Sequence, residues 1–350
     1  MRSRRNAAVV LIAAAVIAAA LVAVQRSRSG SDAGGSDASG VKPPLRGLVD
    51  QYSASATLGA PIHSFVVSAD WAELQLRPNG PIVRPNVIDA ALADVRARGT
   101  RSPAVQLKLR VFAGIGAPEW AKHLSGEPFT IGDPTSGRNG TVGRFWTPAF
   151  GEAYAQFQRA LAKLYDRRAE ISEVTISRCT TVFAEPFLRQ LAYPGAADAY
   201  LEAGYTRAAD RRCHTEEIEA HRVWRHTRSG LALNPYQYVS PTGRGLVDES
   251  ETETMMQYCR KQLGERCVLE NNSIRWPPAA NRYSTMYAAM KRFGPPIAFQ
   301  TAAAARIGDP VRTVVWAIRF GASSVELGAR ANAYSAHELV NLDERLTANR

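Results

Sequence analysis

Short apolar runs alternate with amphipathic runs along most of this chain. The apolar runs are rich in β-branched residues and four to eight residues long, which is typical of buried strands. Seven runs are clear, at residues 64–69, 105–112, 174–177, 231–234, 267–271, 297–301 and 323–327. An eighth strand is expected at residues 45–51, although the segment that follows it leaves little room for a helix.

Between these runs, apolar residues recur at three- and four-residue spacing, which predicts helices. The expected helices cover residues 87–98, 150–165, 200–224, 253–263, 283–292, 310–320 and 336–346. Strands that alternate with helices imply parallel strands joined by right-handed crossovers. Eight such strands predict a closed (β/α)8 barrel of the α/β class over residues 43–350. An open doubly wound sheet is the alternative, but the sequence lacks its glycine-rich phosphate turn.

The N-terminal region has a different pattern. Residues 7–24 are 18 consecutive apolar residues with arginines on both sides, which predicts a signal anchor or a cleaved signal peptide. We favour the anchor because Leu21 stands where a signal peptidase prefers a small residue. Either interpretation places the rest of the chain outside the cytoplasm, anchored to the cell membrane or secreted. Residues 25–42, rich in glycine, serine and aspartate, are expected to form a flexible linker.

Composition narrows the function. The 350 residues are 45% hydrophobic, which is enough for a large core. Of the formal net charge of +11, five positive charges flank the apolar run, and the remaining arginines are scattered. No Lys/Arg-rich run with interleaved aromatic residues occurs, which argues against nucleic-acid binding. The missing Gly-x-Gly-x-x-Gly and Walker motifs argue against a nucleotide, and we expect no cofactor.

The chain has four cysteines, at positions 179, 213, 259 and 267. An even number in an exported chain suggests two disulfides, although the sequence permits three pairings, and four buried thiols are the alternative. A Cys259–Cys267 bond would close a short loop between a helix and a strand. A Cys179–Cys213 bond would tie a strand-end loop to the next helix. The cysteine and histidine spacings do not fit a zinc site, so no metal is expected.

The chemistry is expected at the carboxyl ends of the strands, where barrel enzymes hold their working residues. These ends are rich in Asn, Gln, Glu, Arg, Tyr and Trp and poor in His and Cys. Amides and carboxylates suit sugar hydroxyls, and aromatic rings suit the C–H face of a sugar. The pattern therefore favours a carbohydrate ligand. No nucleophile elbow accompanies the six histidines, and the His214 and Glu217 pair on one helix face is typical of a surface pair.

Segment 174–187 (VTISRCTTVFAEPF) places Glu185 in an Ala-Glu-Pro turn just past a strand. This turn resembles the Asn-Glu-Pro turn after the fourth strand of clan A glycoside hydrolases, the (β/α)8 group of cellulases and β-galactosidases. Here Ala184 replaces the asparagine. The segments WAELQ, which begins at Trp71, and APEW, which ends at Trp120, are similar to strand ends of β-galactosidase-type barrels.

The resemblance implies hydrolysis of a glycosidic bond by two carboxylates, with Glu185 as general acid/base. The nucleophile is expected after the seventh strand, where this chain has Gln300, and an amide cannot take that role. Glu326, at the end of the last strand, is the best substitute. Further options are Glu270, Asp70 and Glu73. The structural alternatives are a Glu326 paired with Arg178, Arg275 or Arg306, and a Glu185 paired with Arg189.

Ten residues are expected to bind the sugar: Trp71, Glu73, Trp120, Arg178, Asn234, Tyr236, Gln237, Asn271, Asn272 and Gln300. The tryptophans could instead pack in the core. Three functions remain open. The first is a membrane-tethered glycosidase. The second, which Ala184 and Gln300 favour, is a catalytically inactive carbohydrate-binding barrel at the cell surface. The third is a scaffold without a sugar site. The expected partners are a carbohydrate and, through the N-terminal helix, a membrane.

Overall fold

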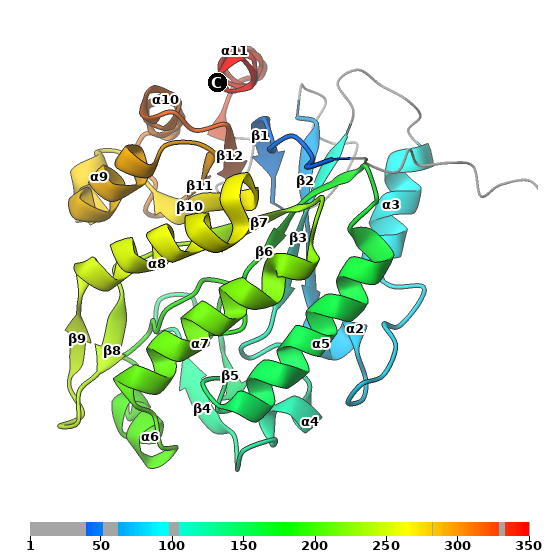
Figure 1. Ribbon diagram of the computed structural model, residues 1–350. Helices are drawn as coiled ribbons and strands as arrows, with labels where there is room; N and C mark the ends of the chain where they lie inside the picture. The colour runs from blue at the N-terminus through cyan, green and yellow to red at the C-terminus, as the bar shows by residue number, and fades with distance from the viewer. Residues whose placement is uncertain (1–39, 52–61, 98–104, 282, 329–332, 350) are drawn as a thin grey trace, which may run out of the picture. The chain divides into compact units, whose positions relative to one another are not determined.

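Eight parallel strands close into a barrel (Figure 1). The computed structural model describes residues 40–51, 62–97, 105–281, 283–328 and 333–349. The strand order around the barrel is β1-β12-β11-β10-β7-β6-β3-β2, and β2 pairs with β1 to close it. The barrel strands are β1 (Gly47–Asp50), β2 (Ser64–Asp70), β3 (Gln106–Phe112), β6 (Ile171–Thr175), β7 (Arg228–Ala232), β10 (Cys267–Ile274), β11 (Ile297–Thr301) and β12 (Ser324–Leu327). All eight predicted strands are present, so the (β/α)8 prediction is confirmed.

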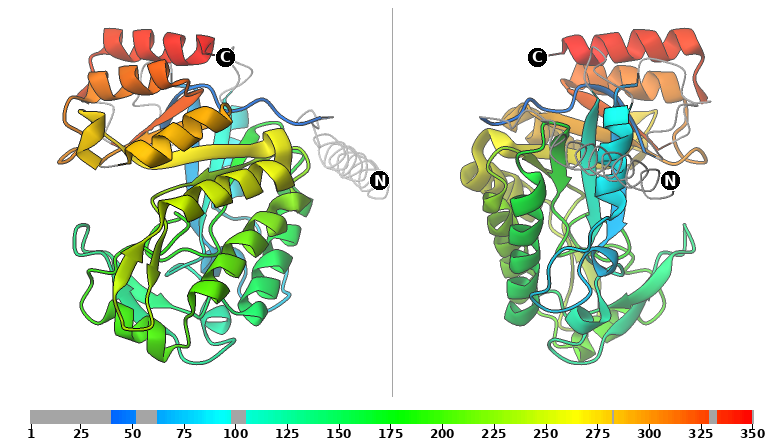
Figure 2. Two further views of the ribbon diagram at one scale, coloured as in Figure 1. Left: turned by 60° about the vertical axis from the view of Figure 1, so that its left-hand side comes forward. Right: turned by 90° about the vertical axis from the view of Figure 1, so that its right-hand side faces the viewer.

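Helices surround the barrel, as Figures 1 and 2 show from different sides. They are α2 (Trp71–Leu74), α3 (Val87–Ala97), α4 (Glu119–Lys122), α5 (Pro148–Tyr165), α6 (Ala196–Glu202), α7 (Arg207–Ala220), α8 (Glu249–Leu263), α9 (Ser284–Phe293), α10 (Pro310–Phe320) and α11 (Ala336–Ala348). The single helix predicted at 200–224 is wrong. Gly204 adopts φ +79° and ends α6, and the Thr206 side chain caps a new helix, α7, by accepting a hydrogen bond from the Ala209 N–H.

Each barrel strand has an apolar outer face and a more polar inner face. In β3, the outer residues Leu107, Leu109 and Val111 are buried in the core between barrel and helices. Lys108 and Arg110 alternate with them and form ion pairs with residues of β10 and β12, which are not neighbours of β3. Contacts across the barrel of this kind require both side chains to point into its interior.

The amino end of the barrel is closed by Lys42. Its Nζ donates to the carbonyl oxygens of Arg168 and Ile171, each at 2.7 Å, and to Thr227 Oγ1 at 2.8 Å. Only 4% of Lys42 is exposed. Although the composition predicts a linker as far as residue 42, Lys42 is thus part of the barrel body.

The carboxyl end of the barrel, which we call the mouth, carries two antiparallel hairpins that were not predicted. The first hairpin pairs β4 (Phe129–Gly132) with β5 (Asn139–Val142) and lies between β3 and α5. The second pairs β8 (Gln237–Val239) with β9 (Gly245–Val247) and lies between β7 and α8. Both lie at the end of the domain opposite α11 (Figure 1).

The N-terminal predictions fall outside this picture. The apolar run at residues 7–24 and nearly all of the predicted linker lie outside the described residues. Among the residues that are described, no helix has the length and apolar character needed to cross a membrane.

Candidate ligand site at the barrel mouth

A buried lysine lies at the centre of the barrel interior. Lys108 Nζ is 2.6 Å from Glu270 Oε2, 3.0 Å from Glu173 Oε1 and 4.0 Å from Glu326 Oε2. All four side chains are almost completely buried. Buried charges of this kind persist only where they are paired. Glu270 is therefore part of an internal ion network, and Glu173 and Lys108, which no motif indicated, belong to the same network.

Glu173 and Glu270 approach each other above Gly230 of β7. A methyl group on Gly230 would collide with Glu270 Oε1 and crowd Glu173 Oε1, so only glycine leaves room for the two carboxyl groups. Burial and the neighbouring Glu173 together raise the pKa of Glu270 to about 8, although Lys108 opposes the shift. The buried Glu270 therefore keeps its proton to a higher pH than a free glutamate does.

Glu326 is bound by Arg110 through both carboxylate oxygens. Arg110 Nη1 donates to Oε1 at 2.8 Å and Nη2 donates to Oε2 at 2.5 Å. Nη2 also donates to Gln300 Oε1 at 3.4 Å, because Gln300 and Glu326 are partners in the β11–β12 register. Glu326 does pair with an arginine, as the structural alternative expected. The arginine is Arg110, however, and not Arg178, Arg275 or Arg306.

Glu185 is half-buried in the loop after β6, and its described hydrogen-bond partner is Asn234 rather than Arg189. Asn234 lies just beyond β7, and its Nδ2 donates to Glu185 Oε2 at 2.9 Å. Glu185 is also close enough to Arg110 for its charge to affect the pKa of the guanidinium. Burial opposes the charge of Arg110, but the carboxylates of Glu326, Glu270 and Glu185 outweigh it and raise the pKa of the guanidinium. Glu185, Asn234, Arg110, Glu326 and Gln300 therefore form one connected cluster at the mouth.

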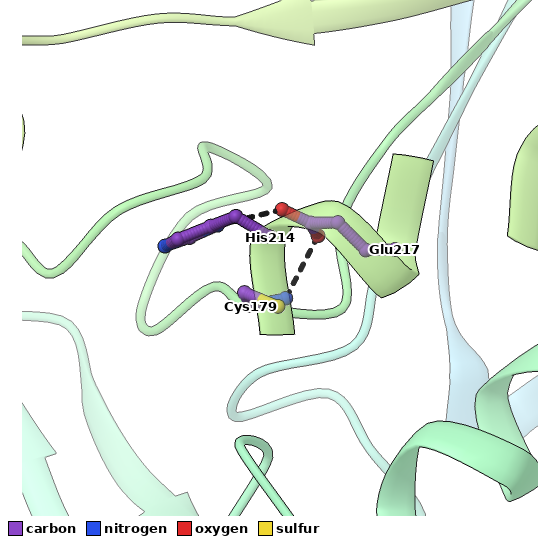
Figure 3. Close-up of side chains that lie close together, drawn as sticks. All are labelled: Cys179, His214 and Glu217. Carbon is purple, nitrogen blue, oxygen red and sulfur yellow. Dashed lines mark hydrogen bonds and ion pairs between the residues drawn. The ribbon is translucent and has the colours of Figure 1, made fainter. Parts of the chain in front are cut away.

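A buried clamp on α7 holds the Glu185 loop. Cys179, at the start of the loop, forms a disulfide with Cys213 of α7, and its backbone N–H donates to Glu217 Oε2 at 2.9 Å. Figure 3 shows Glu217 reaching both Cys179 and His214. Their side-chain atoms are close enough to share a metal ion, but the Cys179 sulfur is taken by the disulfide. A second disulfide joins Cys259 and Cys267, so the expected number of disulfides is confirmed and their pairing, which the sequence left open, is settled.

His214 is the charged centre of this clamp. Its Nδ1 is 2.9 Å from Glu217 Oε1 and its Nε2 is 3.5 Å from Asp210 Oδ1. Burial alone would lower the pKa of His214, but the two carboxylates outweigh it and raise the pKa to about 9. The expectation of a surface pair for His214 and Glu217 is wrong, because both side chains are completely buried under the loop.

Four of the ten expected sugar-binding residues lie in the packed layers around the barrel. Trp71 is fully buried, with its ring stacked on Phe157 at 5.0 Å. Arg178 donates to the carbonyl oxygens of residues 145 and 147, and it pairs with Glu216 at 2.7 Å. Tyr236 donates to Asp210 Oδ2 at 2.8 Å. Asn271 accepts a hydrogen bond from Tyr287 of α9 at 3.0 Å and so points outward. None of these side chains is offered to a ligand at the mouth.

The other six are distributed more widely. Asn234 and Gln300 belong to the mouth cluster described above. Asn272 is half-buried and lies two residues beyond Glu270 on β10. Glu73 is exposed and accepts a hydrogen bond from the Asp70 N–H as part of the α2 capping box. Gln237 begins β8. Trp120 is half-buried and lines a separate hollow of about 140 Å³ with residues of α5.

The mouth also carries two aromatic rings that no motif indicated. Phe112 follows Arg110 by two residues on the inner face of β3, and Phe183 precedes Glu185 by two residues. Both rings are half-buried, and the guanidinium of Arg138 lies over both. The alternation of β3 could have indicated Phe112. The contact of Arg138 depends on the β4–β5 hairpin, whose turn residues Asp-Pro-Thr-Ser-Gly at 133–137 could have indicated it.

No family model matches this chain, and no curated protein matches it. Solved structures do match over most of the chain. An iminocyclitol complex of endo-glycoceramidase II from Rhodococcus sp. has a TM-score of 0.50 at 13% identity, over 87% of this chain and 81% of that one. The β-amylase catalytic domain from Paenibacillus polymyxa has a TM-score of 0.49 at 10% identity, over 88% and 96%. At such identities the likeness concerns the fold alone. The chain is a (β/α)8 barrel whose fold is similar to that of the endo-glycoceramidase.

Proposed function

We propose that the mouth binds a glycan and does not cleave it by the usual pair of carboxylates. The mouth combines the carboxylate of Glu185, which the buried Asn234 amide holds in place, with the amide of Gln300 and the rings of Phe112 and Phe183. Amides and carboxylates match sugar hydroxyls, and the rings match an apolar sugar face. The endo-glycoceramidase in the iminocyclitol complex was solved with a sugar-like ligand on the same fold.

The proposal that the glycan is not cleaved rests on the contacts of Glu326. Paired-carboxylate hydrolysis needs a second acid that attacks the sugar or activates a water. In this chain, Arg110 engages both oxygens of Glu326, and Gln300 stands at the end of the seventh strand. A two-point guanidinium pair is among the strongest charge-assisted contacts in proteins. This arrangement supports a structural role for Glu326 beneath the ligand.

The test uses the full-length protein, a glycan array and titration of the glycans that the array retains. We expect saturable binding without new reducing ends. Glu185→Gln should weaken binding about tenfold, because the amide cannot reproduce the charge-assisted contacts of the carboxylate. Glu253→Gln, on the outer surface of α8, is the matched control and should bind normally. Retention of no glycan by the wild-type protein would refute the proposal.

The second candidate is glycoside hydrolysis, with Glu185 donating the proton and Glu326 acting as nucleophile or base. It is favoured by one observation, that both carboxylates act on the same guanidinium of Arg110 and so belong to one cluster. On this reading, wild-type protein releases reducing sugar, and Glu185→Gln abolishes turnover while the fold stays intact. Release of reducing sugar in the array experiment would therefore replace the binding proposal with this one.

We also propose that the barrel works outside the cytoplasm, anchored to the membrane or secreted. The two disulfides support an oxidising compartment. The apolar run at residues 7–24 supports export. We expect added protease to degrade the barrel on intact cells if it is anchored, or the barrel to be recovered from the medium if it is secreted. A barrel that is protected inside intact cells would contradict this proposal.

A further inference from the structure

One arginine at the mouth is held in place without a carboxylate partner. Arg138 ends the turn between β4 and β5, and its Cζ lies 5.1 Å from the centre of the Phe112 ring and 5.7 Å from that of Phe183. Two rings at these distances attract a guanidinium through their negative faces. The two rings position the guanidinium, but its N–H groups can still donate hydrogen bonds to another molecule.

Within the described residues, no carboxylate oxygen lies within ion-pair distance of Arg138, and its guanidinium makes no hydrogen bond to another side chain or carbonyl. Three other cations differ from Arg138 in this respect, because each is paired with a carboxylate. Arg110 is bound by Glu326, Lys122 by Glu119 at 2.7 Å, and Arg207 by Asp248. Arg138 is exposed to solvent, so its donors remain available to a ligand.

The position of Arg138 relates it to the proposed ligand site. Phe112 and Arg110 share the inner face of β3, and Phe183 belongs to the loop that carries Glu185. The guanidinium therefore contacts the same strand and the same loop that carry Arg110 and Glu185. Such a group selects ligands by charge more than it adds to general affinity.

We propose that Arg138 makes the mouth selective for acidic glycans, by pairing with a carboxylate carried by the sugar. This inference rests on the proposed function, because it names the ligand class of the same site. A planar guanidinium presents parallel N–H groups that match the two oxygens of a carboxylate. A uronic or sialic acid could therefore place its carboxylate on Arg138 and its hydroxyls near Glu185 and Asn234.

Within the described residues, the acids already at the mouth make no ion pair with Arg138. The Glu185 carboxylate accepts a hydrogen bond from the Asn234 amide. Asp70, at the end of β2, is half-buried, and its burial and the neighbouring Glu73 raise its pKa, although Arg138 and Lys122 oppose the shift. The charge of Arg138 therefore acts on Asp70, but within the described residues Asp70 forms no ion pair that would occupy the guanidinium.

The experiment uses the full-length protein and an array that carries neutral glycans together with glycans containing uronic and sialic acids. Each acidic glycan that the array retains is also tested after its carboxyl groups have been reduced to hydroxymethyl groups. We expect wild-type protein to bind the acidic form at least about tenfold more tightly than the reduced form, a preference that rising salt weakens. Arg138→Gln should bind the two forms equally, and Arg138→Lys should retain only part of the preference.

The control is Arg292→Gln, which removes an exposed arginine that lies beside the ring of Phe293 on α9, and this variant should keep the wild-type preference. Retention of neutral glycans alone, or an unchanged preference in Arg138→Gln, would overturn the inference and leave the proposed function standing. Retention of no glycan would refute both. Loss of binding to neutral and acidic glycans alike in Arg138→Gln, with unchanged circular dichroism, would show a general contact rather than charge selection and would also overturn it.

Discussion

At the scale of single residues, the barrel interior is defined by charges that only the closed fold brings together. Glu270 lies beside Glu173 and is paired with Lys108, yet the three residues come from three different strands. The alternation of apolar and polar residues predicts which residues point inward. It cannot predict which inward charges will meet, because that depends on the register and tilt of strands far apart in the sequence.

The raised pKa of Glu270 makes stability depend on pH. The folded pKa of Glu270, about 8, is above its ordinary value of 4.5, so folding favours the protonated acid. This stabilisation is complete below about 4.5 and is lost as pH rises through about 8, by an amount on the order of a few kcal/mol. Glu270→Gln, which is always neutral, should remove this part of the decline. Urea unfolding at several pH values measures the free energy of unfolding of both proteins. If this free energy fell equally with pH in wild type and variant, the account would be contradicted.

At the scale of elements, the loop that carries Glu185 depends on α7. The sequence pattern predicted a helix in this region, and the even number of cysteines correctly predicted two disulfides, although it left their pairing open. It did not predict the break at Gly204, since a glycine inside an amphipathic run is read as helix unless the chain needs a left-handed turn there. The hairpins were missed for a similar reason, because short strands at a loop depend on tertiary contacts.

Glu217 is the residue of α7 whose loss should matter most. Glu217→Gln leaves the buried, positively charged His214 with one carboxylate fewer and weakens the acceptor of the Cys179 N–H. We expect a loss of about 3 kcal/mol in the free energy of unfolding. Glycan affinity should also weaken, because the loop that holds Glu185 becomes less rigid. Chemical denaturation and titration measure the two effects. Glu219→Gln, exposed on the same helix, is the control, and equal stability of both variants would argue against the clamp.

At the scale of the whole molecule, the fold was predictable and the site only in part. Eight strand runs sufficed for the barrel, because strands that alternate with helices have few ways to pack. Asn234 and Gln300 could be placed at the mouth because Asn234 follows a strand and Gln300 lies near the carboxyl end of one. Trp71 and Tyr236 could not be assigned to the core in this way, because a strand-end aromatic can turn toward the mouth or toward the helices. Arg138 and Phe183 could not be brought together without the hairpin.

The most direct test is native mass spectrometry of full-length protein incubated with a glycan that the array retains. The account predicts a complex whose added mass equals that of the intact glycan, and a strongly reduced population of this complex for Glu185→Gln. Fragments of the glycan, bound or free, or an equally populated complex for the variant, would contradict the claim that Glu185 anchors an uncleaved sugar at the barrel mouth.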